Sequence, residues 1–197
     1  MGKTKDNQPK NIVLERLDYY YGRYRIISGF MNEEFHAYAY TGSRVIRKFS
    51  GSNQDTIVQQ LKDALHEHME DLKSRRGEDG VPCAEEYREA IESMKDEISQ
   101  KQVALLKIHA RTQGNKITIK DLMRDAGCDT LEEADALYAR VGRTLSIFLD
   151  FKPQAEELPL PLKSIHVIAI PQGQRSEGLW EWTLRPQVIE ALEQVKV

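Results

Sequence analysis

The sequence is poor in cysteine: its 197 residues include only Cys83 and Cys128, and they form no CxxC pair. A zinc site built from paired cysteines is therefore not expected, and both thiols are predicted to be reduced. No apolar run approaches the roughly 18 residues of a membrane-spanning helix. The polar residues 1–10 also lack the apolar centre of a signal peptide. We therefore expect a cytoplasmic protein with no membrane partner.

Motifs that carry catalysis are missing as well. There is no glycine-rich phosphate loop, no GxSxG, no HExxH and no cysteine beside a histidine motif. The histidines, at positions 36, 66, 68, 109 and 166, do not have the spacing of an HNH nuclease. His66 and His68 lie two positions apart, which places them on different faces of a helix. We therefore expect a protein that is not an enzyme and that uses no metal and no cofactor.

The composition, 40% hydrophobic and 30% charged, is ordinary for a soluble chain long enough to form two small domains. Its charge is distributed unevenly. Residues 1–76 contain 13 basic and 10 acidic residues, net +3, whereas residues 77–157 contain 11 and 17, net −6. The basic part is thus N-terminal and the acidic part central.

Residues 1–76 are predicted to form a small domain, a meander of three or four antiparallel strands followed by one helix. Within residues 34–41, Phe35, Ala37 and Ala39 alternate with His36, Tyr38 and Tyr40. This period of two predicts one buried and one solvent-facing side. An apolar stripe then predicts a helix that covers the sheet, with Ile57, Leu61, Ala64, Leu65, His68 and Leu72.

Basic and aromatic residues gather on the predicted strands. They are Arg23, Arg25, Tyr38, Tyr40, Arg44, Arg47 and Lys48. Such a mixture can follow a nucleic-acid backbone and stack on bases. The alternative is a solvated strand face with ordinary cross-strand pairs.

Residues 77–98 are predicted to be a linker and an acidic helix. The segment 75–82 is rich in glycine and charge. The helix, over 84–98, has Tyr87, Ile91 and Met94 on one side and carries Glu85, Glu89 and Glu92. Its acids indicate either a solvated face or a surface that contacts a basic protein.

Residues 99–197 are predicted to form a winged helix-turn-helix. A helix over 102–110, a short strand, a helix capped by Thr118 and a turn at 127–129 lead into a third helix, capped by Thr130. A strand over 165–170, a loop and a strand over 179–184 would form the wing. A final helix begins at Pro186.

The third helix begins with Asp129, Glu132, Glu133 and Asp135, where a winged helix usually enters the major groove. Carboxylates there would oppose phosphate, although they also complement the helix dipole. We assign Glu132, Glu133 and Asp135, together with the acids of the helix over 84–98, Glu85, Glu89 and Glu92, to a protein interface. Arg140, Arg143, Arg175 and Arg185 leave nucleic-acid binding through another face open.

Several segments of the last half of the chain resemble a known family. They are 105–110, 117–118, 125–127, 138–145, Trp182 and 184–192. These segments resemble a winged-helix-like domain that accompanies HNH-type endonuclease domains in bacterial restriction-like proteins and occurs alone in phage and prophage proteins. The resemblance implies target recognition beside a nuclease. Because the nuclease motif is absent, it implies no nuclease chemistry here, and it assigns no residue a role.

We therefore expect an α+β fold and a non-enzymatic, phage- or prophage-type DNA-binding or regulatory protein. One alternative is a protein-interaction module that inhibits or adapts a host nuclease or defence complex through its acidic helices. The other is the recognition subunit of a separately encoded nuclease. The expected partner is accordingly a nucleic acid, DNA in the first instance, or a protein.

Overall fold

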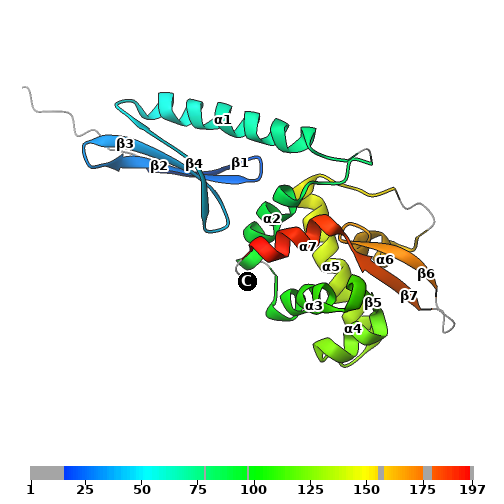
Figure 1. Ribbon diagram of the computed structural model, residues 1–197. Coiled ribbons are helices and arrows are strands. Elements are labelled where there is room, and N and C mark those ends of the chain that lie inside the picture. Colours follow the sequence, from blue (N-terminus) through cyan, green and yellow to red (C-terminus); the bar gives the residue numbers. More distant parts are fainter. Residues whose placement is uncertain (1–15, 78, 97, 155–157, 175–178, 196–197) are drawn as a thin grey trace, which may run out of the picture. The chain divides into compact units, whose positions relative to one another are not determined.

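The computed structural model describes residues 16–77, 79–96, 98–154, 158–174 and 179–195. Contacts divide the chain into two units. The first contains Met1–Tyr40 and Val45–Ala64, and the second contains Thr41–Arg44 and Leu65–Val197. An antiparallel sheet with a helix belongs to the first unit, and helices with a small second sheet belong to the second (Figure 1). The predicted α+β class is confirmed.

The first unit is built on a four-strand meander. Its strands are β1 (Leu17–Tyr21), β2 (Tyr24–Met31), β3 (Glu34–Thr41) and β4 (Arg44–Gly51), in the order β1-β2-β3-β4. The turn between β2 and β3 has Asn32 and Glu33 in the left-handed region, with φ values of 53° and 69°. Two left-handed residues in a two-residue loop match the twist of the paired strands. The meander predicted from the alternating pattern is therefore confirmed.

One side of this sheet packs on helix α1 (Gln54–Ser74). Tyr24, Ile26, Ala37 and Ala39 are fully buried, and the first half of α1 buries Ile57, Val58 and Leu61. Asn53 begins the helix, because its side chain accepts a hydrogen bond from the Thr56 amide at 2.9 Å. The period of two in the strands and the apolar stripe of the helix thus build one core.

The second unit consists mainly of helices. They are α2 (Ala84–Ser93), the short η1 (Met94–Asp96), α3 (Gln100–Arg111), the short η2 (Gln113–Asn115), α4 (Ile119–Ala126), α5 (Leu131–Leu149), α6 (Leu160–Ile165) and α7 (Pro186–Gln194). Three strands, β5 (Lys116–Thr118), β6 (Ala169–Gln174) and β7 (Trp180–Leu184), form a sheet in the order β5-β7-β6. Side chains of Ser99, Thr118 and Thr130 cap α3, α4 and α5, as the sequence predicts for the last two.

The predicted strand over 165–170 is wrong over residues 165–168. Ile165 ends helix α6, and β6 begins only at Ala169. Ile165, Val167 and Ile168 are all buried in the core of the second unit. A short run of buried apolar residues has no period that separates strand from helix, which is why α6 was not predicted.

Helices α5 and α6 touch through their backbones. A Cβ atom at Gly142 would lie 1.9 Å from the carbonyl oxygen of Ser164. Any residue other than glycine at position 142 would therefore force the two helices apart.

Helix α2 belongs to the core of the second unit and is not part of a linker. Tyr87, Ala90, Ile91 and Met94 join the same cluster of buried residues as Trp182. A basic side chain neutralises the charge of a buried acid in this helix. Glu86 is fully buried and accepts two hydrogen bonds from Arg76, at 2.9 and 2.7 Å. The two observed units are therefore divided at other positions than the predicted domains, whose boundaries lay between residues 76 and 77 and between residues 98 and 99.

None of the helices within the described ranges is long and apolar enough to cross a membrane.

Candidate nucleic-acid interface

The side of the first sheet that faces away from α1 carries a row of rings. We call it the aromatic face. It contains Asp18 and Tyr20 from β1, Arg25 and Ile27 from β2, and His36, Tyr38 and Tyr40 from β3. These residues alternate along their strands with side chains that face α1, so the pleat places them together.

The rings of β3 lie one after another along the strand. The centroids of His36 and Tyr38 are 6.2 Å apart with planes inclined by 16°, and those of Tyr38 and Tyr40 are also 6.2 Å apart, inclined by 37°. Tyr40 stands opposite Arg25, which in turn stands opposite Tyr20. Tyr20 is 72% exposed. Four rings, one from β1 and three from β3, thus lie on this face, with Arg25 of β2 between Tyr20 and Tyr40.

The charge of this face is modest. Arg25 donates two hydrogen bonds to Asp18, from Nε at 2.8 Å and from Nη2 at 2.7 Å. This contact lowers the pKa of Asp18 and raises that of Arg25. Both side chains are exposed, so the pair contributes little to stability. A phosphate that approached Arg25 would have to compete with the Asp18 carboxylate.

Two other predicted basic residues lie exposed on the neighbouring strand β4. They are Arg47 and Lys48. Arg47 alternates with Arg44 and Ile46, and its Nη1 donates to the carbonyl oxygen of Ile46 at 3.0 Å. The two cations remain accessible to a ligand.

The prediction that Arg23 belongs to the solvent face is wrong. Arg23 lies in the turn between β1 and β2, and its Nε donates to the hydroxyl of Tyr24 at 3.2 Å. Its guanidinium is 5.5 Å from the centre of the Tyr24 ring. Tyr24 is fully buried on the side that faces α1, so Arg23 is drawn to that side.

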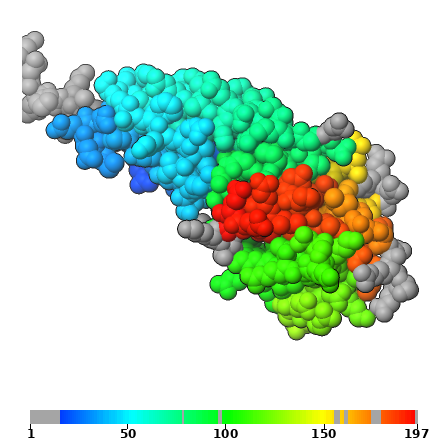
Figure 2. Space-filling view, viewed as in Figure 1, coloured from blue at the N-terminus to red at the C-terminus, as the bar shows by residue number. Residues whose placement is uncertain are grey.

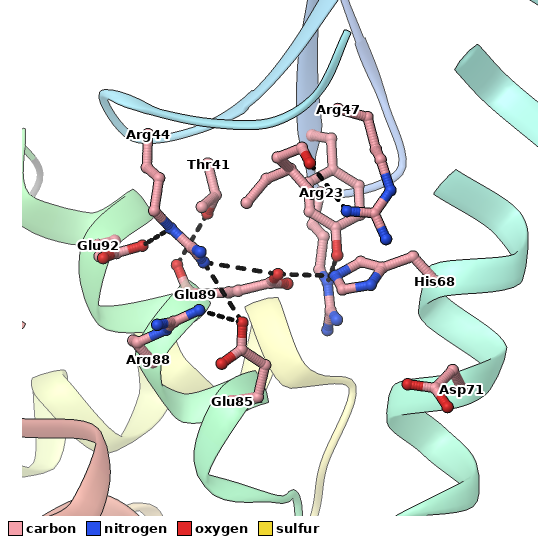
Figure 3. Close-up of polar contacts among 12 residues, drawn as sticks. Arg23, Thr41, Arg44, Arg47, His68, Asp71, Glu85, Arg88, Glu89 and Glu92 are labelled. Atoms are coloured by element: carbon pink, nitrogen blue, oxygen red, sulfur yellow. Dashed lines mark hydrogen bonds and ion pairs between the residues drawn. The ribbon is translucent and has the colours of Figure 1, made fainter. Parts of the chain in front are cut away.

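Arg44 also lies elsewhere, in an ion-pair cluster with the acids of α2 (Figure 3). Its Nε donates to Glu92 at 2.6 Å, and its Nη2 lies 3.6 Å from Glu85 and 3.7 Å from Glu89. Glu89 in addition contacts Nε2 of His68 at 2.8 Å. The cluster is internal to the second unit, to which the turn Thr41–Arg44 belongs.

This cluster corrects two predictions at once. Arg44 was assigned to nucleic-acid binding and Glu85, Glu89 and Glu92 to a docking surface, but these opposite charges bind one another. Glu89 is fully buried and cannot meet a partner. Sequence analysis missed Thr41, whose hydroxyl donates to the carbonyl oxygen of Glu89 at 2.9 Å. No local pattern joins residues 48 positions apart, so only the fold reveals the pairing.

The remaining predicted residues lie on or near α5. Arg140 and Arg143 are exposed on the same stripe of this helix as Ile147. Glu133 pairs with Lys101 at 2.7 Å and accepts from the Asp129 amide at 2.8 Å, and Lys101 lowers its pKa. Glu133 is therefore occupied as part of the helix cap. Arg175 lies outside the described residues.

Glu132 and Asp135 line a groove at the start of α5, which we call the α5 groove. It measures about 220 Å³, and Leu131, Leu162 and Trp180 contribute its apolar lining. Asp135 is half-buried, and burial raises its pKa. A second hollow of about 340 Å³ lies between α3 and α7, whose green and red surfaces adjoin in Figure 2.

Comparison with protein families, curated proteins and solved structures found no match to this chain. The family resemblance of the last half therefore stays a hypothesis. Within the parts of the chain that the structure describes, no group of three or more His, Cys, Asp or Glu side chains is placed to hold a metal ion.

Proposed function

We propose that this chain is a non-enzymatic nucleic-acid-binding protein of the phage or prophage regulatory type, acting in the cytoplasm, and that its aromatic face binds single-stranded DNA. The observation that carries the proposal is the row of His36, Tyr38 and Tyr40, flanked by the exposed Tyr20. Bases of a single strand stack on such rings whatever their sequence, because every base has a π-face.

The few free cations of the first unit favour binding through stacking of bases on the rings over binding through contacts between cations and phosphates. Arg47 and Lys48 are exposed, whereas Arg25 is already paired with Asp18. Few cations are thus available to release counterions from DNA. We expect an affinity whose dependence on salt is shallow, with a slope that corresponds to about two or three phosphate contacts.

The second unit supports a role in regulation. The order of elements from α3 to β7, and the sheet order β5-β7-β6, resemble those of a winged helix. The beginning of α5 is acidic, so a phosphate would be repelled where a recognition helix usually meets DNA. Arg140 and Arg143, farther along α5, offer this unit its own basic surface.

Removing two rings tests the proposal. The double substitution Tyr38→Ala with Tyr40→Ala should weaken binding of a fluorescein-labelled oligothymidine by about thirtyfold or more, because each stacked base contributes about 1–3 kcal/mol. Fluorescence anisotropy at low salt measures the change.

Two control variants show whether the loss of binding comes from the rings of the aromatic face. Tyr38→Phe with Tyr40→Phe keeps both rings and should bind nearly as well as the unmodified protein. Phe30→Ala removes a 44% exposed ring on the opposite side of the sheet and should have no effect. Unchanged binding by the double alanine variant would exclude the aromatic face.

The α5 groove favours a second function, an interface for another protein. Asp135 has no hydrogen bond or ion pair with any described residue, and apolar side chains surround it. A partner segment that presents a basic residue among apolar ones would complement this groove. If the unmodified protein binds no oligonucleotide even at low salt, this second function is favoured over the first.

A further inference from the structure

A pocket of about 570 Å³ lies in the second unit and shares no lining residue with the aromatic face or the α5 groove. Val81, Phe151, Pro153 and Ile170 form its apolar lining, and Arg185 contributes a cation. Small-molecule sites commonly have volumes of about 300–1,000 Å³ with mostly apolar walls and a few polar groups. The pocket has the size of such a site, and its walls combine apolar side chains with several polar ones.

Arg185 is a buried cation that forms no ion pair with any carboxylate of the described residues. Only 7% of the residue is exposed. Its Nε and Nη2 both donate to the carbonyl oxygen of His166, at 3.1 and 2.9 Å, and its guanidinium lies 5.8 Å from the centre of the Phe151 ring. Its Nη1 forms no hydrogen bond with the described residues, and no carboxylate among them forms an ion pair with the side chain.

This arrangement differs from that of Arg76, another inward-facing arginine of the unit. Arg76 is held by two hydrogen bonds from its guanidinium to Glu86. At Arg185, by contrast, burial lowers the pKa, and Asp79 at the pocket only partly offsets this effect. A buried charge is costly unless it is paired. Within the described residues no carboxylate is bound to the guanidinium of Arg185, which is therefore available to an anion.

His166 adds a second polar group to the same pocket. Its Nδ1 is buried and has no hydrogen-bond partner among the described residues. Burial and the neighbouring charge of Arg185 lower the pKa of this imidazole. A ligand that accepts hydrogen bonds would satisfy His166 and Arg185 together.

We propose that this pocket binds a small monocarboxylate whose carboxylate accepts hydrogen bonds from Arg185 Nη1 and His166 Nδ1. The apolar body of the ligand lies against Phe151, Pro153 and Ile170. A single negative charge is favoured because Asp79 also lines the pocket and repels a dianion. This site is independent of the aromatic face and of the function proposed for it.

Benzoate is the probe that tests the proposal, with benzamide as its uncharged counterpart and phenyl phosphate as a dianion. In ¹H–¹⁵N spectra, benzoate should shift the amides around Phe151, His166 and Arg185 in a saturable manner and should raise the pKa of His166. Benzamide should cause no such shifts, and phenyl phosphate should bind more weakly than benzoate. Equal effects of benzoate and benzamide would overturn the proposal.

A pair of matched variants locates the site. Ile170→Glu adds a carboxylate at the pocket, where the isoleucine is 37% exposed, and should weaken benzoate binding at least about tenfold. Ile147→Glu makes the same change at a 78% exposed position on α5 and should leave binding unchanged. Neither variant removes a core contact, so both should fold. Benzoate binding that survives Ile170→Glu would place the probe elsewhere and refute the assignment.

Discussion

Replacement of Trp182 by alanine is expected to destabilise the second unit by about 3 to 5 kcal/mol, the usual effect of removing a large aromatic side chain from a core. Trp182 is 1% exposed and is the largest of the fully buried side chains. It stands opposite Ile117 of β5 and Pro171 of β6, at the centre of the small sheet. Its removal would leave a cavity where three strands and the helices behind them meet.

Chemical denaturation, followed by circular dichroism, measures this loss. Trp180→Ala is the matched control, because that ring lies on the same strand, 6.3 Å from Trp182, but is only half-buried. The control should cost clearly less than Trp182→Ala. A loss below about 1 kcal/mol for Trp182→Ala would mean that this tryptophan is not central to the core.

Acidification is expected to weaken the fold through His109, which is fully buried between α3, α5 and the small sheet. Its Nε2 lies 3.0 Å from the carbonyl oxygen of Asn115 and 3.1 Å from that of Trp182. Since both groups are acceptors, Nε2 must carry the proton and donate it. Nδ1 is then the acceptor for the hydroxyl of Tyr138. The neutral imidazole satisfies every partner, whereas a second proton would add an unbalanced charge to the core.

Burial accordingly lowers the pKa of His109 to about 4, from 6.5 in an unfolded chain. Between these values the unfolded state binds a proton that the folded state does not. The free energy of unfolding should thus be unaffected by this group above about pH 6.5 and should fall by about 3 kcal/mol as the pH decreases towards 4.

Denaturation midpoints at about pH 7 and about pH 4.5 measure the effect. His166, whose pKa is also lowered, changes stability in the same direction, so a variant is needed to isolate His109. His109→Gln keeps a donor and an acceptor but does not titrate, and its stability should depend less on pH. An identical pH dependence in this variant and the unmodified protein would contradict the assignment.

The parts of the fold that the sequence predicts are those determined by neighbouring residues. The alternation of Ala37 and Ala39 with Tyr38 and Tyr40 fixes the faces of β3. Gly127 ends α4 in the left-handed conformation, with φ of 64°, and Thr130 caps the next helix. Helix α6 could not be predicted, because Ile165 at its end and the apolar residues 167–170 that lead into β6 have the composition of a single strand.

The candidate interface was predicted in part for the same reason. Tyr38, Tyr40 and Arg25 share one face by alternation, and the same rule would have added Tyr20 and His36. Arg44 and Arg47 lie three positions apart in β4, so alternation places their side chains on opposite sides of the strand. Counting basic residues does not reveal this difference. The pairing of Arg44 with Glu92 depends on tertiary structure and leaves no trace in either local sequence.

Glycine at position 142 makes the formation of helix α5 depend on that of helix α6. A glycine inside a helix weakens it by about 1 kcal/mol relative to alanine, so the middle of α5 is intrinsically fragile. Helix α6, over Leu160–Ile165, is far too short to persist alone. The close backbone contact between the two helices, which only glycine permits, exists only when both are formed. The two helices should therefore form in one kinetic step, and the amide protons around Gly142 and Ile165 should exchange with solvent through a shared opening event.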